Sequence, residues 1–211
     1  MARHRHRTTS AWRTYPGVVR GDGDGWVVSD AGTHHWGRFG AAGLLVRAPR
    51  ADGSPAVLLQ HRAPWSHQGG TWGLPGGALD SHEEPEDAAL REAEEEAGLH
   101  RVHLRVRARV KTAEIVGPGG VYWRYTTVVA DAPGLLDTVL NPESSELRWV
   151  AEDEVAWLPL HPGFAASWDR LRISEAVPPH SCGLDLPHTL EVTEIGFAWC
   201  TAAISRGAGR R

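Results

Sequence analysis

The sequence has 211 residues, of which 41% are hydrophobic and 23% are charged, with 22 basic and 26 acidic side chains. These values are typical of a soluble globular protein with one domain and extensions. The formal net charge of −4 indicates no strong attraction to nucleic acid or to a membrane, so we expect neither as a partner.

Two further features concern the cellular location. The longest apolar stretches, 40–46 and 56–59, are much shorter than the ~20 residues of a membrane-spanning helix. The first residues, MARHRHRTTSAWR, are charged and lack the apolar core of a secretory signal. Cys182 and Cys200 are far apart; a disulfide between them is one alternative, and we expect two free thiols in a cytoplasmic protein.

Residues 1–25 are predicted to form a flexible basic arm. The first 20 residues contain five Arg and no acid, and the turn sequence GDGDG follows at 21–25. The arm would serve as a solubilising tail; attraction of anionic nucleotides or nucleic acid is the alternative. GDGDG does not fit a calcium-binding EF-hand loop, because the later oxygen ligands and the closing Glu are missing.

The pattern of apolar and polar residues predicts strands before and after one central helix. Before the helix we expect a hairpin at 26–40, strands at 41–47 and 56–61, and a glycine-rich loop at 69–77. After it we expect strands at 102–116, 121–130 and 146–151, and short helices at 152–158 and 163–172. A C-terminal extension, 173–211, would add one strand at 188–200 and a basic tail. This order is typical of an α+β or α/β sandwich.

The central helix is predicted at residues 85–97. Pro85 suits the first helical position, and the acids that follow it favour the positive end of the helix dipole. Leu90, Ala93 and Ala97 form one apolar stripe, and Gly98 is a typical residue to end a helix.

The acidic residues are concentrated around this helix, with nine of the 26 between positions 80 and 96. Such a run is usually a solvated surface. Here, however, Glu92, Glu95 and Glu96 project to one side of the helix, and like charges one turn apart repel each other. Arg91 offsets only part of this repulsion. Because Mg²⁺ prefers carboxylate oxygens together with substrate phosphates, the spacing predicts a metal and phosphate site.

The acidic segment is similar to the signature of the Nudix hydrolases. The matching pattern is Gly77-x5-Glu83-x7-Arg91-Glu92-Ala93-x-Glu95-Glu96-x-Gly98-Leu99. Ala93 stands where the family usually has a larger aliphatic residue. So many fixed positions make the match far more specific than a short glycine motif.

The resemblance implies both a fold and a chemistry. Nudix hydrolases fold as an α/β/α sandwich with a mixed β-sheet, and the signature forms a loop–helix–loop catalytic box. They hydrolyse a diphosphate linked to another moiety, using Mg²⁺ or, as a substitute, Mn²⁺. We therefore expect residues 26–172 to form such a domain.

The same resemblance implies roles for individual residues. Metal ligands would be the Gly77 carbonyl and the carboxylates of Glu92, Glu95 and Glu96. Arg91 would hold these carboxylates in place, and Glu83 would brace the loop before the helix. Glu95 is expected to activate the attacking water, with Glu92 and Arg91 also catalytic; the base differs between family members.

Three stretches resemble the MutT-type branch, which cleaves nucleoside triphosphates, such as 8-oxo-dGTP, to monophosphate and pyrophosphate. They are LLQHRA at 58–63, TWGLPGG at 71–77 and ESSELRWV at 143–150. In that branch a glutamate six residues before a Trp completes the metal site; Glu143 matches, and Glu146 is the alternative. Arg62 matches an arginine that contacts phosphate or base, and a surface charge is the equally weighted alternative.

The residues that would select the base are less clear. The branch places an Asn or Asp pair after the late strand, whereas this chain has LHPGF at 160–164. Phe164, or Trp168, is a candidate for stacking on the base, as are Trp65 and His67 in the loop before the signature. Simple packing is the alternative for each.

Two other functions remain open. One is hydrolysis of a different substrate, such as ADP-ribose or a dinucleoside polyphosphate. The other is a non-catalytic Nudix module that senses a ligand; this is disfavoured because such modules commonly lose the signature glutamates, and all are present here. The oligomeric state is not predicted.

Overall fold

The computed structural model describes residues 21–116 and 122–172. The predicted arm up to residue 20 and the extension at 173–211, with its expected strand at 188–200, its basic tail and both cysteines, lie outside the described residues. No helix among the described residues is long and apolar enough to cross a membrane.

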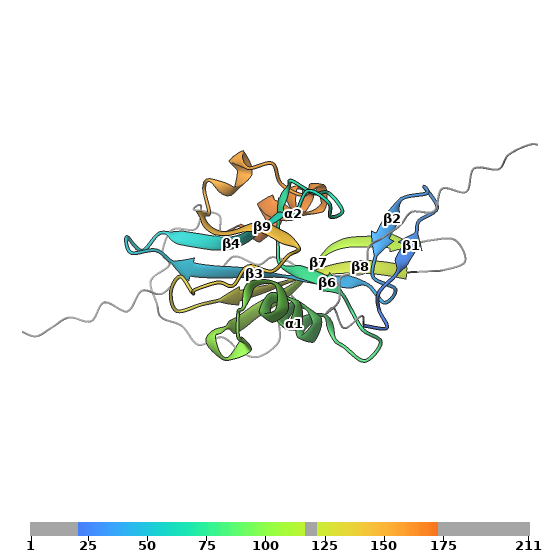
Figure 1. The fold of residues 1–211 in the computed structure, drawn as a ribbon, viewed down its shortest axis with the longest axis horizontal. Helices are drawn as coiled ribbons and strands as arrows, with labels where there is room; N and C mark the ends of the chain where they lie inside the picture. The colour runs from blue at the N-terminus through green and yellow to red at the C-terminus, as the bar shows by residue number, and fades with distance from the viewer. Residues whose placement is uncertain (1–20, 117–121, 173–211) are drawn as a thin grey trace, which may run out of the picture.

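A mixed seven-stranded sheet forms the centre of the molecule (Figure 1). Its strands are β3 (Ala41–Pro49), β4 (Pro55–Arg62), β5 (Trp72–Gly73), β6 (Gly76–Ala78), β7 (Arg105–Val116), β8 (Tyr122–Asp131) and β9 (Ser144–Ala151). The main order is β5-β4-β3-β8-β7, with β6 paired to β3 and β9 paired to β4. β3 and β8 run parallel, whereas the other pairs are antiparallel.

The two faces of the sheet are covered by different helices, α1 (Pro85–Ala97) and α2 (Pro162–Leu171), which lie on opposite sides in Figure 1. Neighbouring strand residues alternate between the faces, so Leu44 packs with the α1 side and Leu45 with the α2 side. The protein is therefore an α/β/α sandwich with a mixed sheet, as the sequence predicted.

The predicted hairpin is present as β1 (Trp26–Val28) and β2 (His34–Trp36), which form a separate two-stranded sheet. Residues 21–25 differ from the prediction of a flexible arm, because their backbone and Asp22 make hydrogen bonds to the domain. Local sequence does not reveal the contacts to Asp80 and Ser81, since these residues lie more than fifty positions away.

Other differences concern the connecting segments. The predicted loop at 69–77 contains β5 and the start of β6, because the edges of β4 and β3 offer partners for their backbone groups. The predicted helix at 152–158 is only a 3₁₀ helix, Val155–Trp157. A second 3₁₀ helix, Arg101–His103, precedes β7 and delays its start to Arg105.

Candidate functional site

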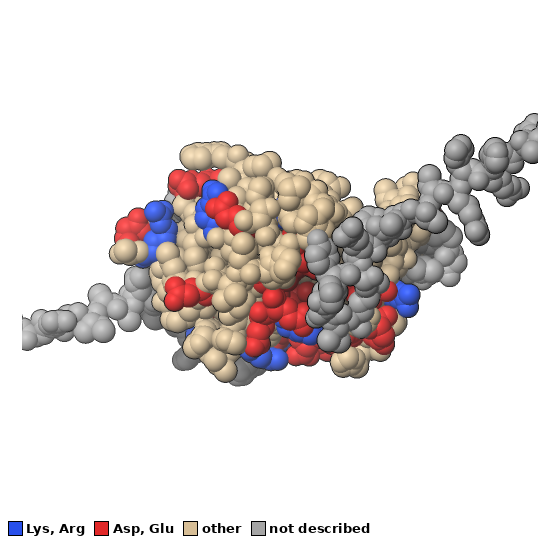
Figure 2. Space-filling view, viewed as in Figure 1, with Lys and Arg blue, Asp and Glu red and all other residues tan. Residues whose placement is uncertain are grey.

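Helix α1 carries most of the candidate site on its edge facing β6. Its buried side is made of small residues, including Ala89, Ala93 and Ala97, each fully buried against the sheet. Small side chains let the helix backbone approach β3 and β6 closely. Figure 2 shows acidic side chains gathered on the surface over α1.

Glu96 is the most deeply placed acid of the predicted set, with only 5% of its surface exposed. Its Oε2 accepts a hydrogen bond of 2.8 Å from the backbone N–H of Gly76 at the start of β6. Burial raises the pKa of Glu96 to about 8, and the nearby charges of Glu92 and Glu143 act in the same direction. The ionised Glu96 carboxylate is therefore not fully neutralised by the positive charges around it.

Glu92 lies beside Glu96 in a similar environment. Its side chain is 16% exposed, and its Oε1 accepts a hydrogen bond of 2.7 Å from the guanidinium of Arg91. Burial nevertheless raises the pKa of Glu92 to about 7, with Glu95 and Glu143 adding repulsion. Arg91 alone does not neutralise the negative charge of these glutamates, whereas a bound divalent cation would.

Gly77 brings the backbone of β6 against this pair. A Cβ at this position would overlap a Glu92 carboxylate oxygen, so a larger residue would force that carboxylate to shift. The side chains gathered here offer carboxylate oxygens, the ligand type that Mg²⁺ and Mn²⁺ prefer. The residues therefore fit a hard divalent cation.

Arg91 is held by Glu83, which supports the predicted role of Glu83 as a brace. The guanidinium donates to both Glu83 oxygens, at 2.7 and 2.9 Å, and to the Ala78 carbonyl at 3.0 Å. These bonds lower the pKa of Glu83. Arg91 also lies 3.7 Å from Glu95, whose side chain is 60% exposed. Arg91 thus connects the loop before α1 to two of the glutamates on the helix.

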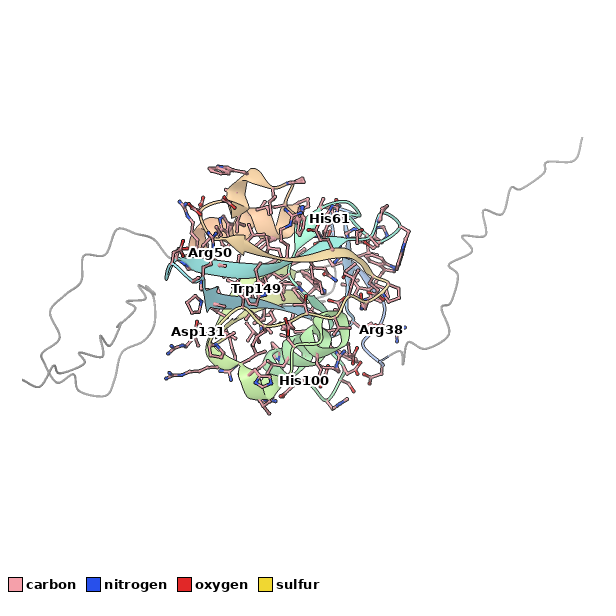
Figure 3. All side chains as sticks on the ribbon, turned by 60° about the vertical axis from the view of Figure 1, so that its left-hand side comes forward. Arg38, Arg50, His61, His100, Asp131 and Trp149 are labelled. Atoms are coloured by element: carbon pink, nitrogen blue, oxygen red, sulfur yellow. The ribbon has the colours of Figure 1, made fainter. Side chains whose placement is uncertain are left out.

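Glu143 and Glu146 fall on different sides of the sheet. Glu143 precedes β9 and is near enough to Glu92 and Glu96 to raise the pKa of both. Glu146 pairs across the sheet with His61 on the α2 face and forms an ion pair of 2.7 Å with Arg148. Figure 3 labels His61 of β4 and Trp149 of β9, the two strands that pair here. Of the two alternatives, Glu143 is the one beside the acidic pair.

Arg62 lies at the end of β4, after an irregularity in its pairing with β9. Its charge offsets a small part of the burial that raises the pKa of Glu96. Its Nε donates 2.9 Å to the carbonyl of His67, so the loop at 63–71 is tied to this arginine. The structure therefore brings Arg62 and His67 together.

The aromatic candidates are divided between surface and core. Trp65 is 54% exposed, and His67 is also exposed, with its ring 5.5 Å from that of Trp26 in the hairpin. Phe164 is instead buried in the α2-side core, 5.4 Å from the ring of Trp168. We correct the expectation that Phe164 stacks on substrate: α2 turns this ring inward, as the packing alternative anticipated.

Three residues near the site were not expected from the sequence. Trp26 reaches the loop at 63–71 from the hairpin, and His161 lies with its ring 6.2 Å from that of His67. Burial, with help from the Arg62 charge, lowers the pKa of His161 to about 4. Tyr125 on β8 has its pKa raised by burial and by Glu96. Only tertiary contacts reveal these residues, because no local spacing connects them to the signature.

Comparison with known proteins agrees with this geometry. Residues 37–171 match the NUDIX domain family. The chain belongs to the Nudix hydrolase family. It is therefore a hydrolase, and Gly77–Leu99 is its Nudix box; enzymes of this family generally use a divalent metal and act on small nucleotide substrates.

Relatives of this Nudix hydrolase include a Mycobacterium tuberculosis protein named "Putative 8-oxo-dGTP diphosphatase 3", 66% identical over 89% of this chain and 88% of the relative. The crystal structure of RenU, a Nudix hydrolase from M. smegmatis, is 68% identical, with a TM-score of 0.69 over 71% of this chain and 92% of RenU. A Caenorhabditis elegans Ap4A hydrolase, 21% identical with a TM-score of 0.52, covers 63% of this chain and 94% of its own, and shares the fold.

Proposed function

We propose that this Nudix hydrolase uses Mg²⁺ to hydrolyse a nucleoside triphosphate, with 8-oxo-dGTP as the preferred class, to monophosphate and pyrophosphate. The observation that carries the proposal is the pair Glu92 and Glu96, buried together beside Gly77, Glu143 and the cationic Arg62. The name of the 66% identical relative supports the substrate.

The proposed metal ligands are the Gly77 carbonyl and the carboxylates of Glu92, Glu95, Glu96 and Glu143. When bound, divalent ions would lower the pKa of the attacking water and neutralise charge on the phosphate oxygens; Mn²⁺ would substitute for Mg²⁺. Glu92 and Glu96 hold a fixed position because Arg91 and the Gly76 N–H donate to them.

Glu95 is the proposed base, with Arg91 and Glu92 as its catalytic neighbours. Its exposed carboxylate lies 3.7 Å from the Arg91 guanidinium and is open to solvent, where it would orient a water and accept its proton. Arg62 would attract the phosphates by charge, and its bond to the His67 carbonyl holds the guanidinium at the end of β4.

The base of the nucleotide would stack on the exposed rings beside Arg62, namely Trp65 and His67. Aromatic faces bind any base by stacking, so these residues support a nucleotide substrate without selecting one base. The buried Phe164 would contribute only by holding α2 in place.

A substrate panel tests the proposal. We expect Mg²⁺-dependent turnover of 8-oxo-dGTP with pyrophosphate release, more efficient than that of dGTP, ADP-ribose, NADH or diadenosine polyphosphates, and lost with a chelator. More efficient turnover of ADP-ribose or a dinucleoside polyphosphate would overturn the substrate but not the hydrolase. Nucleotide binding without hydrolysis of any compound would instead indicate a ligand-sensing module.

A further inference from the structure

Residues 21–36 precede the segment that matches the family, yet Asp22 and Gly23 in this stretch contact the Nudix box. Asp22 accepts two hydrogen bonds from Ser81, 2.9 Å from its backbone N–H and 2.5 Å from its hydroxyl. The N–H of Gly23 donates 3.0 Å to Oδ1 of Asp80. Asp22 and Gly23 thus contact two consecutive residues of the loop that leads into α1.

Gly23 lies directly on the backbone of the box. A Cβ at this position would overlap the Leu79 carbonyl oxygen, so a larger residue would push the two segments apart. The other side of the segment is anchored to the residues that precede β3, because the backbone N–H of Arg38 donates 2.8 Å to the Gly23 carbonyl and that of Gly37 donates 2.8 Å to the Gly25 carbonyl. The docked segment is therefore fixed at both sides.

The contacted loop leads to the metal-facing carboxylates through a short series of hydrogen bonds. The Asp80 N–H donates 3.0 Å to Glu83, which accepts two bonds from Arg91, and Arg91 in turn donates to Glu92. Displacement of residues 80 and 81 would move Glu83 and release Arg91. Asp22, Asp80 and His82 also place possible ligand atoms within 4.8 Å of one another. The Asp22 and Asp80 carboxylates, however, are already engaged as hydrogen-bond acceptors.

We propose that Asp22 and Gly23 are positioning residues of the active site, which hold the Nudix box loop so that Glu83 and Arg91 orient the metal-binding glutamates. The inference rests on the proposed metal site.

The chain provides a matched control for Asp22. Asp52, in the turn between β3 and β4, accepts the same two bonds from Ser54, at 2.9 Å from the N–H and 2.6 Å from the hydroxyl. Both aspartates have a pKa lowered by these bonds. The hydrogen bonds of Asp52 both go to Ser54, within the same turn, so replacing Asp52 removes an equivalent motif that has no such bond to the box.

The test compares Asp22→Ala with Asp52→Ala in the full chain. Loss of a group that orients metal ligands typically weakens metal affinity or activity by about 10- to 100-fold. We expect Asp22→Ala to weaken Mg²⁺ binding about 10-fold by calorimetry and to lower kcat with little change in KM. Asp52→Ala should match the wild type. Asp22→Asn, whose amide oxygen still accepts the Ser81 N–H, should restore part of the affinity.

Equal Mg²⁺ affinity and kcat in Asp22→Ala and Asp52→Ala would overturn the inference. A lower melting temperature of Asp22→Ala with unchanged Mg²⁺ affinity would also overturn it. If Asp22→Ala does not fold, Ser81→Ala and its control Ser54→Ala test the inference by the same measurements of Mg²⁺ affinity and kcat. Each of these variants removes only a hydroxyl group. The calorimetry does not depend on the nucleotide. If the wild type hydrolyses no nucleotide, the proposed substrate fails while the Mg²⁺ affinities still test the positioning role.

Discussion

At the scale of single residues, the site is defined by carboxylates that the protein itself leaves incompletely neutralised. Glu92 and Glu96 have raised pKa values because burial removes water and each lies near other acids. Placing ionised groups in such positions costs stability, and such costs are common where a fold is shaped to bind a ligand.

We expect Glu96→Gln to reduce hydrolysis by more than about 100-fold, because even residues that only orient metal ligands cost 10- to 100-fold. The metal-free variant should melt at or above the wild-type temperature, since it lacks a buried charge. Glu94→Gln is the control on the same helix, because Glu94 is 51% exposed and contacts His100 instead of the acidic pair. Near-normal turnover in Glu96→Gln would contradict the metal site.

The raised pKa values also predict how stability depends on pH. The ordinary Glu value is 4.5, whereas Glu92 and Glu96 titrate in the folded protein at about 7 and about 8. The folded state thus binds more protons than the unfolded state between these limits, and the free energy of unfolding falls as pH rises. His161 opposes this only at lower pH, because its lowered pKa makes the unfolded state bind more protons below about 6.5.

The measurement is thermal unfolding at pH 6.5, 7.5 and 8.5. In a chelator the melting temperature should decrease across this series. Saturating Mg²⁺ should largely remove the decrease, because bound cations keep both carboxylates ionised. A similar slope in both conditions would count against metal binding by Glu92 and Glu96.

At the scale of elements, the sequence predicted those helices and strands whose bounds depend on local residues. Helix α1 has the bounds that Pro85 and Gly98 predicted, and the apolar stripe with Ala93 and Ala97 faces the sheet. The helix predicted at 152–158 is wrong except for a 3₁₀ turn at Val155–Trp157. Val155 is buried in the core, and this tertiary packing is not visible in the local sequence. The short strands β5 and β6 exist only because β4 and β3 supply their partners.

One buried ion pair links β3 to the segment after β9, and its arginine also bonds to the end of α2. Arg47 on β3 forms a bidentate pair with Glu152, after β9, and also donates to the carbonyl of Leu171 at the end of α2. Its nearly full burial sets it apart from surface pairs, whose worth is usually about 0–1 kcal/mol.

We expect Glu152→Ala to lower the free energy of unfolding by about 3–5 kcal/mol, because it leaves the Arg47 charge buried without its carboxylate. Glu146→Ala, which breaks the half-exposed pair with Arg148, should change it by at most about 1 kcal/mol. Urea denaturation of the two variants measures the contrast. Equal effects would show that burial does not decide the contribution of these pairs.

At the scale of the whole molecule, the signature predicted the family and the sandwich, and with them the glutamates on α1. It could not predict the neighbourhood of the box. Residues 21–25, Trp26, Tyr125 and His161 come from distant positions in the chain, and only the folded domain brings them there. No periodicity in the sequence records such pairings.

The intact site should also couple metal binding to global stability. Ligand at 100 times its Kd stabilises a protein by about 2.7 kcal/mol, so Mg²⁺ or Mn²⁺ should raise the melting temperature of the wild type in proportion to the logarithm of its concentration. The Glu96→Gln variant should lose most of this rise, whereas Glu94→Gln should keep it. Scanning calorimetry across a Mg²⁺ titration gives both results, and an identical rise in the two variants would argue for binding elsewhere.

The parallel pairing of β3 with β8 has a consequence for how the enzyme comes into existence. Ala41 pairs with Tyr125, and the whole Nudix box lies between them in the chain. Contacts so distant along the sequence form slowly, because a long loop must close first. On the ribosome, α1 therefore has no complete sheet to pack on until β8 has emerged, and Glu143 arrives later still. A nascent chain that stops before β8 would carry every box glutamate and yet have no catalytic centre.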